Sequence, residues 1–539
     1  MSAGAMGDGR IKTSDNLGTL VAQAAQFYGD RPFLLWQGRQ ISYGDLDRSS
    51  GQFARGMAEL GLQKGDRVAV MLDNCPEYLF AWFGAVKLGA IEVSINTAFK
   101  GSILQYILVN CGAIAIVIAP EMMEALLPEL ASLPDLQTII TVGPGNVPSI
   151  PGRRVVPAKS FETLTPLSPD ASPIDIAVLG YTSGTTGPSK GAMLTHNRIV
   201  KTGEEMARVR RVGPDDNLYT CLPLFHGNAK FLTIMPALVT GARASLGSRF
   251  SASQFWNEVR SVKATQFNYL GVMISVLFKQ PPAVNDRDHS VRLGWGAGAM
   301  REMLPLFEGR FGVLLIEGYG LTEGGIPLSN TLSERRIGSC GKPMPGYEVD
   351  VVDDWDNPVA PGHDGELVVR ARWPHTTMAG YHGMPDKTVE IYRNFWLHTG
   401  DLGRKDEDGF FYFLDRKKDA IRRRGENISS FEVEAAVNTH PVILESAAFP
   451  IKSDVTEDDV MVVAVIRPGE LLTPEAFTEH CIARMPYFWV PRFVRLTTQP
   501  LPRTPTNKVE KYRLRDQGVT SDTWDREKAG FKLVRSNHE

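Results

Sequence analysis

The chain has 539 residues, which at roughly 150 residues per domain allow three or four compact units. Hydrophobic residues make up 43% and charged residues 22%, an ordinary globular composition that excludes a disordered or fibrous protein. Lysine plus arginine (58) nearly balance aspartate plus glutamate (61), so the formal charge of −3 gives no overall positive field for nucleic acid or anionic lipid.

The cysteines and the apolar segments indicate the compartment. None of the five cysteines forms a close CxxC pair, so we expect neither a disulfide framework nor a structural zinc site. Residues 1–15 lack the apolar core of a signal peptide, and no run approaches the roughly 20 apolar residues that span a bilayer. We therefore expect a cytoplasmic protein without an integral membrane segment.

Strand-like and helix-like segments alternate through the first two-thirds of the chain. Apolar runs typical of strands occur at residues 67–72, 113–119 and 138–142, with helical periodicity around them. This alternation predicts an α/β architecture in which helices cover two sheets. The proline-rich segment 143–173 has the composition of a surface excursion without a core of its own.

The pattern changes twice in the last third. From about residue 338, short alternating strands separated by turn residues predict a small β-barrel or meander. After residue 415, the order helix, strand, strand predicts a small, mobile α+β domain. We place the boundary between a large domain (1–414) and a small domain (415–539).

Six of the nine residues from 416 to 424 are lysine or arginine. Such a basic run fits a solvated hinge between domains. It also fits a face that binds a polyphosphate or coenzyme A, and both readings stay open.

The segment 181–191, YTSGTTGPSKG, directly follows an apolar strand. Its glycines let the backbone approach a ligand, its hydroxyls offer hydrogen-bond donors and its lysine adds a cation, which together suit a chain of phosphates. It is not a Walker A loop, because its lysine lies between serine and glycine. A plain Ser/Thr/Gly turn is the structural alternative. The residues expected to hold phosphate are Thr182, Ser183, Gly184, Thr185, Thr186, Gly187 and Lys190.

This segment closely resembles the phosphate loop of the adenylate-forming superfamily, which includes acyl-CoA synthetases, luciferases and peptide-synthetase adenylation domains. Five further blocks resemble that family's motifs in the family's order, at residues 222–229, 318–324, 397–401, 414–434 and 502–508. The wording of residues 280–292, 411–416 and 423–434 is most similar to the branch around the crotonobetaine/carnitine–CoA ligases. The resemblance extends over nearly the whole chain.

The resemblance implies a nucleotide site. Tyr319, between two small glycines, would offer an exposed ring face to adenine, although such a tyrosine could also simply be packed. Thr322 offers a hydroxyl to phosphate, and Glu323 matches the family's Mg²⁺ ligand, a hard oxygen donor that would otherwise be a solvent-facing charge. The implied residues are Gly298, Ala299, Tyr319, Gly320 and Thr322 for adenine and phosphate, Asp401 and Arg416 for ribose, and Thr186 and Glu323 for Mg²⁺.

The small domain contributes the implied catalytic lysine. Lys508, in PRTPTNK, lies far along the chain from the phosphate loop and would neutralise charge during adenylation when the small domain closes. Lys418 matches the family's hinge position, and rotation there would bring Gly425 against the pantetheine arm of coenzyme A. Ser430 stands where the family usually has proline, which affects only local rigidity.

The acid pocket is expected around His226, Asn228, Lys230, Gly318 and Gly324. The resemblance makes His226 a gate at the carboxylate, although a lone histidine is often a satisfied core residue. Lys230 suggests a short or polar acid, such as one with a second carboxylate that the ammonium group could meet. Alternatively, Lys230 points to solvent.

The function implied is an ATP-dependent carboxylic acid:CoA ligase that forms acyl-AMP, releases pyrophosphate and transfers the acyl group to coenzyme A. Its catalytic residues would be Lys508, Lys190 and His226. The alternatives are an adenylation enzyme that loads a carrier-protein thiol and a non-catalytic nucleotide sensor. The sequence leaves the acid undetermined, and a homodimer is one assembly that it allows.

Overall fold

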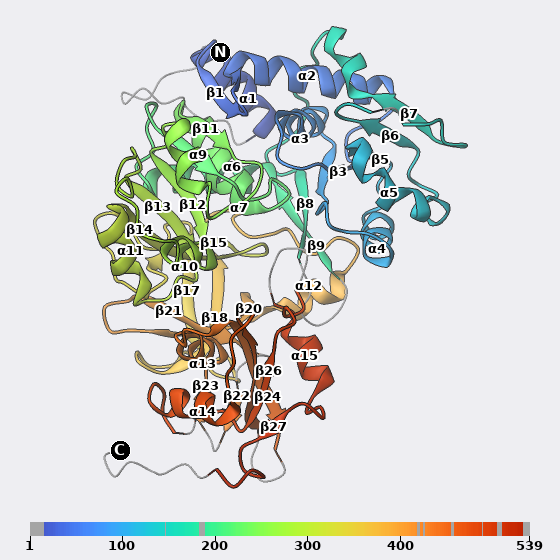
Figure 1. Cartoon of the computed structure of the whole chain (residues 1–539). Helices are drawn as coiled ribbons and strands as arrows, with labels where there is room; N and C mark the ends of the chain where they lie inside the picture. The colour runs from blue at the N-terminus through green and yellow to red at the C-terminus, as the bar shows by residue number, and fades with distance from the viewer. Residues whose placement is uncertain are drawn as a thin grey trace.

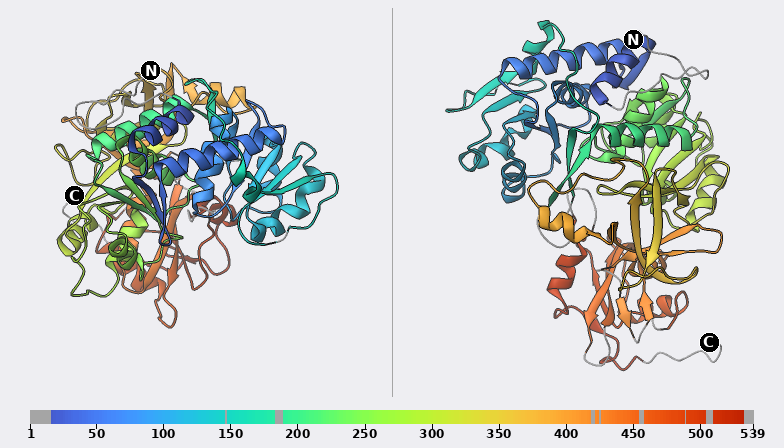
Figure 2. Two further views of the ribbon diagram at one scale, coloured as in Figure 1. Left: turned by 90° about the horizontal axis from the view of Figure 1, so that it is seen from above. Right: turned by 180° about the vertical axis from the view of Figure 1, so that it is seen from behind.

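A computed structural model describes residues 16–145, 147–182, 189–417, 421–423, 426–453, 458–487, 489–503 and 509–531. Two large sheets lie side by side, a smaller sheet lies below them in Figure 1, and the C-terminal domain forms the opposite end of the molecule (Figures 1 and 2). None of the described helices has both the length and the apolar character needed to cross a membrane.

The first large sheet has seven strands in the order β7-β6-β5-β3-β4-β8-β9. Neighbouring strands are parallel, except that β8 and β9 form an antiparallel pair. The strands are β3 (Arg67–Met71), β4 (Ile91–Ser94), β5 (Ala115–Ile118), β6 (Thr138–Thr141), β7 (Arg154–Pro157), β8 (Ile176–Thr182) and β9 (Lys190–Thr195). The helical segments are α1 (Leu17–Tyr28), α2 (Tyr43–Glu59), α3 (Pro76–Leu88), α4 (Ser102–Cys111), η1 (Pro120–Met122), α5 (Met123–Leu126), η2 (Leu127–Ser132) and η3 (Ala158–Thr163).

The inner strands of this sheet are apolar along their length because both faces are covered. Val68 and Val70 of β3 face one hydrophobic core, and Ala69 and Met71 face another. All residues of β5 and β6 are buried. The strands predicted at residues 67–72, 113–119 and 138–142 are therefore confirmed as β3, β5 and β6.

The second large sheet has nine strands in the order β16-β15-β14-β13-β12-β10-β11-β1-β2. Its centre, from β14 to β1, is parallel, and antiparallel strands close both edges. The strands are β1 (Pro32–Trp36), β2 (Arg39–Ser42), β10 (Asn217–Thr220), β11 (Arg243–Leu246), β12 (Gln266–Leu270), β13 (Leu293–Ala297), β14 (Leu314–Leu321), β15 (Gly325–Ser329) and β16 (Lys342–Pro343). The helical segments are α6 (His196–Val209), α7 (Gly227–Ala229), the π-helical turn η4 (Lys230–Ile234), α8 (Met235–Thr240), α9 (Phe255–Ser261), α10 (Gly271–Phe278) and α11 (Met303–Phe311).

A five-stranded half-barrel occupies the place of the predicted small barrel. Its pairs are antiparallel, and β20 binds β18, β19 and β21. Its elements are β17 (Tyr347–Val352), β18 (Asp364–Ala371), α12 (Pro385–Ile391), β19 (Tyr392–Arg393), β20 (Trp396–Lys405) and β21 (Phe411–Arg416).

The small C-terminal domain has its own hydrophobic core, which includes Val433, Val462 and Phe477. The helix predicted after residue 415 and the two strands that follow it are confirmed as α13, β24 and β25. The elements are β22 (Ile421–Arg423), β23 (Glu426–Ile428), α13 (Ser430–Val437), β24 (Ile443–Lys452), β25 (Asp458–Ile466), α14 (Pro474–Ile482), β26 (Phe493–Thr497), α15 (Lys511–Gln517) and β27 (Trp524–Asp525).

The expected boundary between residues 414 and 415 lies within β21. A residue of the small domain makes a hydrogen bond to this strand. The backbone N–H of Ser430 donates a hydrogen bond to Asp415 Oδ2 at 2.5 Å. Ser430 Oγ accepts a hydrogen bond from Lys511 Nζ at 2.6 Å. A proline at position 430 could make neither contact. The serine therefore adds one hydrogen bond to β21 and one within the small domain, which is more than the local change in rigidity that the sequence suggested.

The expectation of a coreless excursion over residues 143–173 is wrong in two places. Residues 154–157 form β7, the edge strand of the first sheet. Phe161, in the 3₁₀ helix η3, is only 4% exposed and packs edge-to-face on Phe53 at 5.5 Å. Gly56 of α2 makes room for this ring, because a Cβ there would lie 2.3 Å from it.

Replacing Phe161 with alanine should therefore destabilise the large domain by about 3–5 kcal/mol, the usual cost of emptying a buried aromatic site. A lower midpoint of urea unfolding would show this. Phe395→Ala is the matched control, since that ring is 90% exposed. Equal midpoints for the two variants would contradict the packing role of Phe161.

Candidate active site

The ends of β8 and β9 flank the predicted phosphate loop. Thr182, the last residue of β8, pairs in register with Lys190, the first residue of β9. The predictions for Ser183, Gly184, Thr185, Thr186 and Gly187 lie outside the described residues, as does the side chain of Thr182. Lys190 is therefore the member of the predicted loop whose side chain can be placed.

Residues 378–382, here called the bridging segment, run antiparallel beside β9. Met193 N–H donates to the Gly380 carbonyl at 2.9 Å, and His382 N–H donates to the Gly191 carbonyl at 2.8 Å. These backbone bonds attach the segment to the strand that begins with Lys190. The first large sheet is thus extended by a piece of chain that precedes α12.

The bridging segment also holds the turn after β14. Met378 N–H donates to the Glu323 carbonyl at 2.8 Å, and Tyr381 Oη donates to Glu323 Oε1 at 2.7 Å. The Lys190 ammonium lies 4.8 Å from the centre of the Tyr381 ring. Two predicted ligand residues, Lys190 and Glu323, are therefore brought together through Tyr381.

Thr322 lies against the first sheet as well. A Cβ added to Gly180 of β8 would come within 3.0 Å of Thr322 Cγ2, so the glycine permits this approach. The guanidinium of Arg198, which is buried at the start of α6, donates from Nη2 to the Thr322 carbonyl at 2.5 Å. Burial lowers the pKa of Arg198, and the nearby tyrosines and Glu323 oppose that shift.

Sequence reasoning missed both Tyr381 and Arg198. Tyr381 is 58 residues from Glu323, and its only local signal is an aromatic residue after glycine. Arg198 follows the phosphate-loop strand, and nothing in the sequence indicates that its side chain turns inward to the distant Thr322. Their roles depend on contacts between the two sheets, which no local pattern encodes.

Three of the residues predicted for adenine and ribose come together. Tyr319 Oη donates to Asp401 Oδ2 at 2.5 Å, and Arg416 Nε lies 2.9 Å from Asp401 Oδ1. β20 and β21 set this geometry, because Asp401 and Arg416 are direct register partners. Burial and the adjacent Asp401 charge raise the pKa of Tyr319 well above its usual value, so its hydroxyl remains a donor.

The expectation that Tyr319 exposes a ring face is wrong for this structure. The ring is only 7% exposed and stacks near Phe413, with centroids 6.3 Å apart. The flanking glycines serve close packing instead: a Cβ at Gly318 would lie 2.6 Å from the Trp295 ring, and one at Gly320 would lie 2.4 Å from Ile326.

Glu317 holds the loop predicted to meet the adenine edge. Ala299 N–H donates to Glu317 Oε1 at 2.9 Å, and Gly298 has the positive φ of +76° that this turn requires. Gly271 leaves room for the loop, since a Cβ there would lie 1.7 Å from the Gly298 carbonyl oxygen. Burial raises the pKa of Glu317 to about 7, opposed by the bond from Ala299 and by Arg335.

Two of the predicted acid-pocket residues, His226 and Asn228, lie at the start of α7. His226 precedes this helix and is partly exposed, with its ring edge-on to Phe225 at 4.8 Å. Asn228 is also partly exposed, and its Oδ1 accepts a hydrogen bond from the buried Asn268 at 2.8 Å. Gly318 and Gly324 are buried. The gating role of His226 stays a prediction.

Neither reading of Lys230 describes the structure. Its side chain is 1% exposed, and its ammonium contacts Glu92 Oε2 at 2.8 Å and Ser94 Oγ at 2.7 Å. Glu92 lies on β4 of the first sheet and is fully buried. The cation is thus satisfied inside the protein, pointing neither to solvent nor freely toward a substrate carboxylate.

Aromatic rings complete the surroundings of this ion pair. The Lys230 ammonium lies 4.9 Å from the Trp82 ring centre and 5.7 Å from that of Phe231. Tyr78 Oη donates to Glu92 Oε1 at 2.8 Å. Burial lowers the pKa of Lys230, and the Glu92 charge opposes that shift. The pair fixes the π-helical turn that follows His226 against the first sheet.

The residues present fit a magnesium ion that arrives with phosphates. Glu323 offers one carboxylate beside the Thr322 hydroxyl, and its side chain is partly exposed. The described parts of the chain contain no group of three or more His, Cys, Asp or Glu side chains able to hold a metal. Mg²⁺ commonly uses one or two protein carboxylates together with water and substrate phosphates.

Three residues of the predicted machinery lie outside the described residues. They are the catalytic candidate Lys508, the hinge candidate Lys418 and the coenzyme A candidate Gly425. Of the basic run, Arg416 pairs with Asp401, and Lys417 pairs with Asp354 at 3.0 Å and Glu366 at 3.2 Å. These two basic side chains are thus engaged by the large domain.

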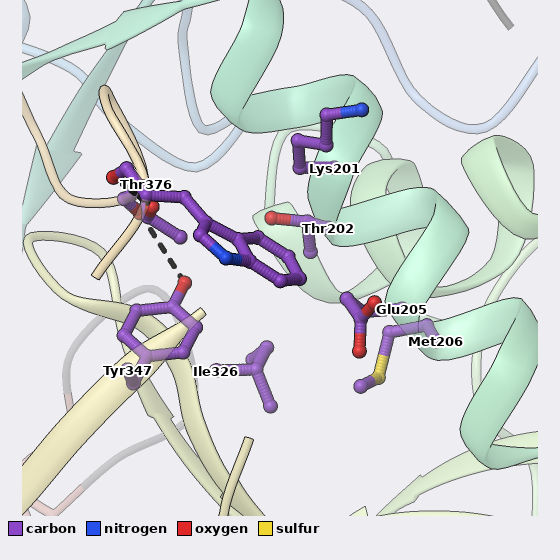
Figure 3. A pocket seen from close by; sticks show the side chains of 8 residues that line it. Lys201, Thr202, Glu205, Met206, Ile326, Tyr347 and Thr376 are labelled. Atoms are coloured by element: carbon purple, nitrogen blue, oxygen red, sulfur yellow. Dashed lines mark hydrogen bonds between the residues drawn. The ribbon is translucent and has the colours of Figure 1, made fainter. Parts of the chain in front are cut away.

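A small recess lies on another part of the large domain, between α6 and the half-barrel (Figure 3). The Tyr347 hydroxyl donates to the Thr376 carbonyl at 3.2 Å at its edge. None of its lining residues belongs to the predicted nucleotide or acid site. The lining residues are Lys201, Thr202, Glu205, Met206, Ile326, Tyr347, Trp373 and Thr376.

Comparisons with known proteins identify the family of the chain. Residues 21–382 match the family model of the AMP-binding enzymes, and residues 432–508 match that of the AMP-binding enzyme C-terminal domain. A crotonobetaine/carnitine–CoA ligase of Salmonella paratyphi A is 33% identical over 519 residues, which cover 94% of this chain and 100% of that protein.

Solved structures show the same fold. The anthranilate CoA ligase AuaEII in complex with anthranoyl-AMP is 26% identical with a TM-score of 0.84, covering 93% of this chain and 97% of that one. ATP-bound MatB from Rhodopseudomonas palustris, 24% identical, has a TM-score of 0.81 and covers 93% of this chain and 98% of its own.

Lys230→Met should lower stability by about 3–5 kcal/mol, because it leaves the Glu92 carboxylate buried without its cation. Replacing both partners, as in Glu92→Leu/Lys230→Met, should recover most of this loss. Urea unfolding measures both effects, with Lys387→Met on the exposed face of α12 as control. If Lys230→Met unfolds at the wild-type midpoint, the ion pair does not have this role.

Glu317→Gln should remove a pH dependence of stability. Because the folded-state pKa of about 7 exceeds the ordinary 4.5, the folded protein binds the extra proton, so wild-type stability falls as pH rises from 4.5 to 7. The free energy of unfolding of the variant, relative to that of the wild type, should therefore increase by roughly 3 kcal/mol over that range. Thermal unfolding at pH 5 and pH 8 tests this. Parallel profiles for the two proteins would refute it.

Proposed function

The chain belongs to the AMP-binding enzyme family, and we propose that it is an ATP-dependent ligase that joins a carboxylic acid to coenzyme A. The acid's carboxylate attacks the α-phosphorus of ATP, so that acyl-AMP forms and pyrophosphate leaves. The thiol of coenzyme A then attacks the acyl carbon, and AMP leaves. The named activities of the similar ligases support this assignment.

One observation carries the proposal: Lys190, Glu323 and Thr322 meet where β9, the β14 turn and the bridging segment join. Nucleotidyl transfer depends mainly on positioning and on stabilising negative charge, so it needs fixed cations and donors rather than a covalent nucleophile. Lys190 supplies such a cation. The group of Tyr319, Asp401 and Arg416 would receive the nucleoside.

Glu323 would hold a magnesium ion, with Thr186 as its predicted companion. Bound there, the ion would neutralise phosphate charge. The chain's part is to keep the Glu323 carboxylate in place at the turn after β14, which the contacts of Tyr381 and Arg198 do.

The contacts of Lys230 change the class of carboxylic acid that we expect as substrate. Because Glu92 neutralises Lys230, the pocket wall offers no free cation from this residue to a second carboxylate. We therefore favour a monocarboxylic acid that is compact or carries a polar atom for the Asn228 amide. His226, partly exposed beside Asn228, would contact the reacting carboxylate.

A panel assay tests this function. The purified chain, supplied with ATP and Mg²⁺, should release pyrophosphate with at least one short, aromatic or polycyclic monocarboxylic acid and should form its CoA thioester. Dicarboxylic acids should react at lower kcat/KM. Transfer to a carrier-protein thiol alone would favour the carrier-loading alternative, and ATP binding without pyrophosphate release would favour the nucleotide sensor.

Lys508→Ala should separate the two half-reactions. Pyrophosphate exchange should fall by about 10²–10³, as expected when one preorganised charge donor is lost. Formation of the thioester from supplied acyl-AMP and coenzyme A should stay within a few-fold of wild type. Lys387→Ala, on exposed α12, is the control. Equal losses in both half-reactions would refute the adenylating role of Lys508.

A further inference from the structure

We propose that Tyr381 is a positioning residue for nucleotide binding: its ring holds the Lys190 ammonium while its hydroxyl orients the Glu323 carboxylate. The inference rests on the proposed function, since it concerns the same site. If Tyr381 has this role, the bridging segment is part of the phosphate-binding site.

Tyr381 is fixed on both sides. Its side chain is only 3% exposed, its backbone bridges to Ala192 of β9, and its N–H donates to Thr388 Oγ1 of α12 at 2.9 Å. A residue held at its backbone by a strand and by a helix has little freedom to move its side chain. Its ring and hydroxyl are therefore fixed reference points for Lys190 and Glu323.

The Tyr381 hydroxyl binds one carboxylate oxygen of Glu323 and leaves the other available to a cation. Oε1 accepts the Tyr381 proton at 2.7 Å. Within the described ranges, Oε2 accepts no hydrogen bond and remains available to a cation. Removing a hydrogen bond that orients a metal-binding carboxylate typically lowers metal affinity by about 10–100-fold.

Burial and the Glu323 charge raise the pKa of Tyr381, so the hydroxyl keeps its proton and remains a donor. Arg198 fixes the same turn from its other side through the Thr322 carbonyl. Two adjacent residues of the turn are thus held by hydrogen bonds: Thr322 by the Arg198 guanidinium and Glu323 by the Tyr381 hydroxyl.

The ring has a separate effect. The Lys190 ammonium lies 4.8 Å from its centre, a distance at which the ring face attracts a cation. This contact holds the lysine against the same side chain whose hydroxyl meets the Glu323 carboxylate. Lys190 would then contribute a cation to a bound phosphate, and Glu323 would contribute a carboxylate to its magnesium ion.

Two variants separate these effects. Tyr381→Phe removes the hydroxyl and keeps the ring, and Tyr381→Leu removes both. By calorimetry of ATP binding at graded Mg²⁺ concentrations, Tyr381→Phe should raise the half-saturating Mg²⁺ concentration by about 10–100-fold. Its ATP affinity in EDTA should stay at the wild-type value. Tyr381→Leu should also weaken ATP binding in EDTA.

Tyr392→Phe is the matched control. Its hydroxyl lies in the same region, 3.1 Å from Thr377 Oγ1 and 3.3 Å from the Met378 carbonyl, and among the described residues it makes no hydrogen bond to Glu323. It should leave the Mg²⁺ dependence unchanged. Circular dichroism and thermal unfolding verify that each variant is folded, and Tyr381→Phe decides the question if Tyr381→Leu does not fold.

Wild-type Mg²⁺ dependence in a folded Tyr381→Phe variant would overturn the inference. An equal change in Tyr392→Phe would also overturn it, because the effect would then be general loosening. If instead the wild-type chain binds Mg²⁺ and ATP but never releases pyrophosphate with any acid, the proposed function fails while the role of Tyr381 can still be measured.

Discussion

The site depends on the backbone pairing between the bridging segment and β9. Through this pairing, one short stretch of chain touches the strand that starts at Lys190 and the turn that carries Glu323. These two elements belong to different sheets, so the proposed phosphate site needs both sheets to bring its lysine and its carboxylate together. Backbone hydrogen bonds fix the register, so the side chain of Tyr381 follows with little remaining freedom.

A buried ion pair and a close packing contact reinforce the junction between the two sheets. Glu92 of β4 meets Lys230 of the π-helical turn, and Gly180 of β8 admits Thr322 from the turn after β14. A buried ion pair seldom adds much net stability, because desolvation offsets the attraction, but breaking it is costly. The value of Glu92 and Lys230 therefore lies in fixing the π-helical turn beside the predicted acid pocket against the first sheet.

Local patterns in the sequence were sufficient for most of the architecture. The apolar strands β3, β5 and β6 and the order of elements in the small domain follow from periodicity, and the family follows from ordered motifs. The errors have one physical origin. Phe161 and Lys230 look like surface residues in sequence because their partners, Phe53 and Glu92, lie more than a hundred residues away. Tyr381 was missed because its partners, Glu323 and Lys190, also lie outside its own segment of the sequence.

If elements of both sheets close on a single nucleotide, hydrogen–deuterium exchange with and without ATP and Mg²⁺ will detect it. Exchange should slow together, at the same nucleotide concentration, in peptides covering residues 190–195, 319–325 and 378–382. Protection confined to one of these peptides, or appearing instead around the recess beside α6, would show that the two sheets do not share one nucleotide.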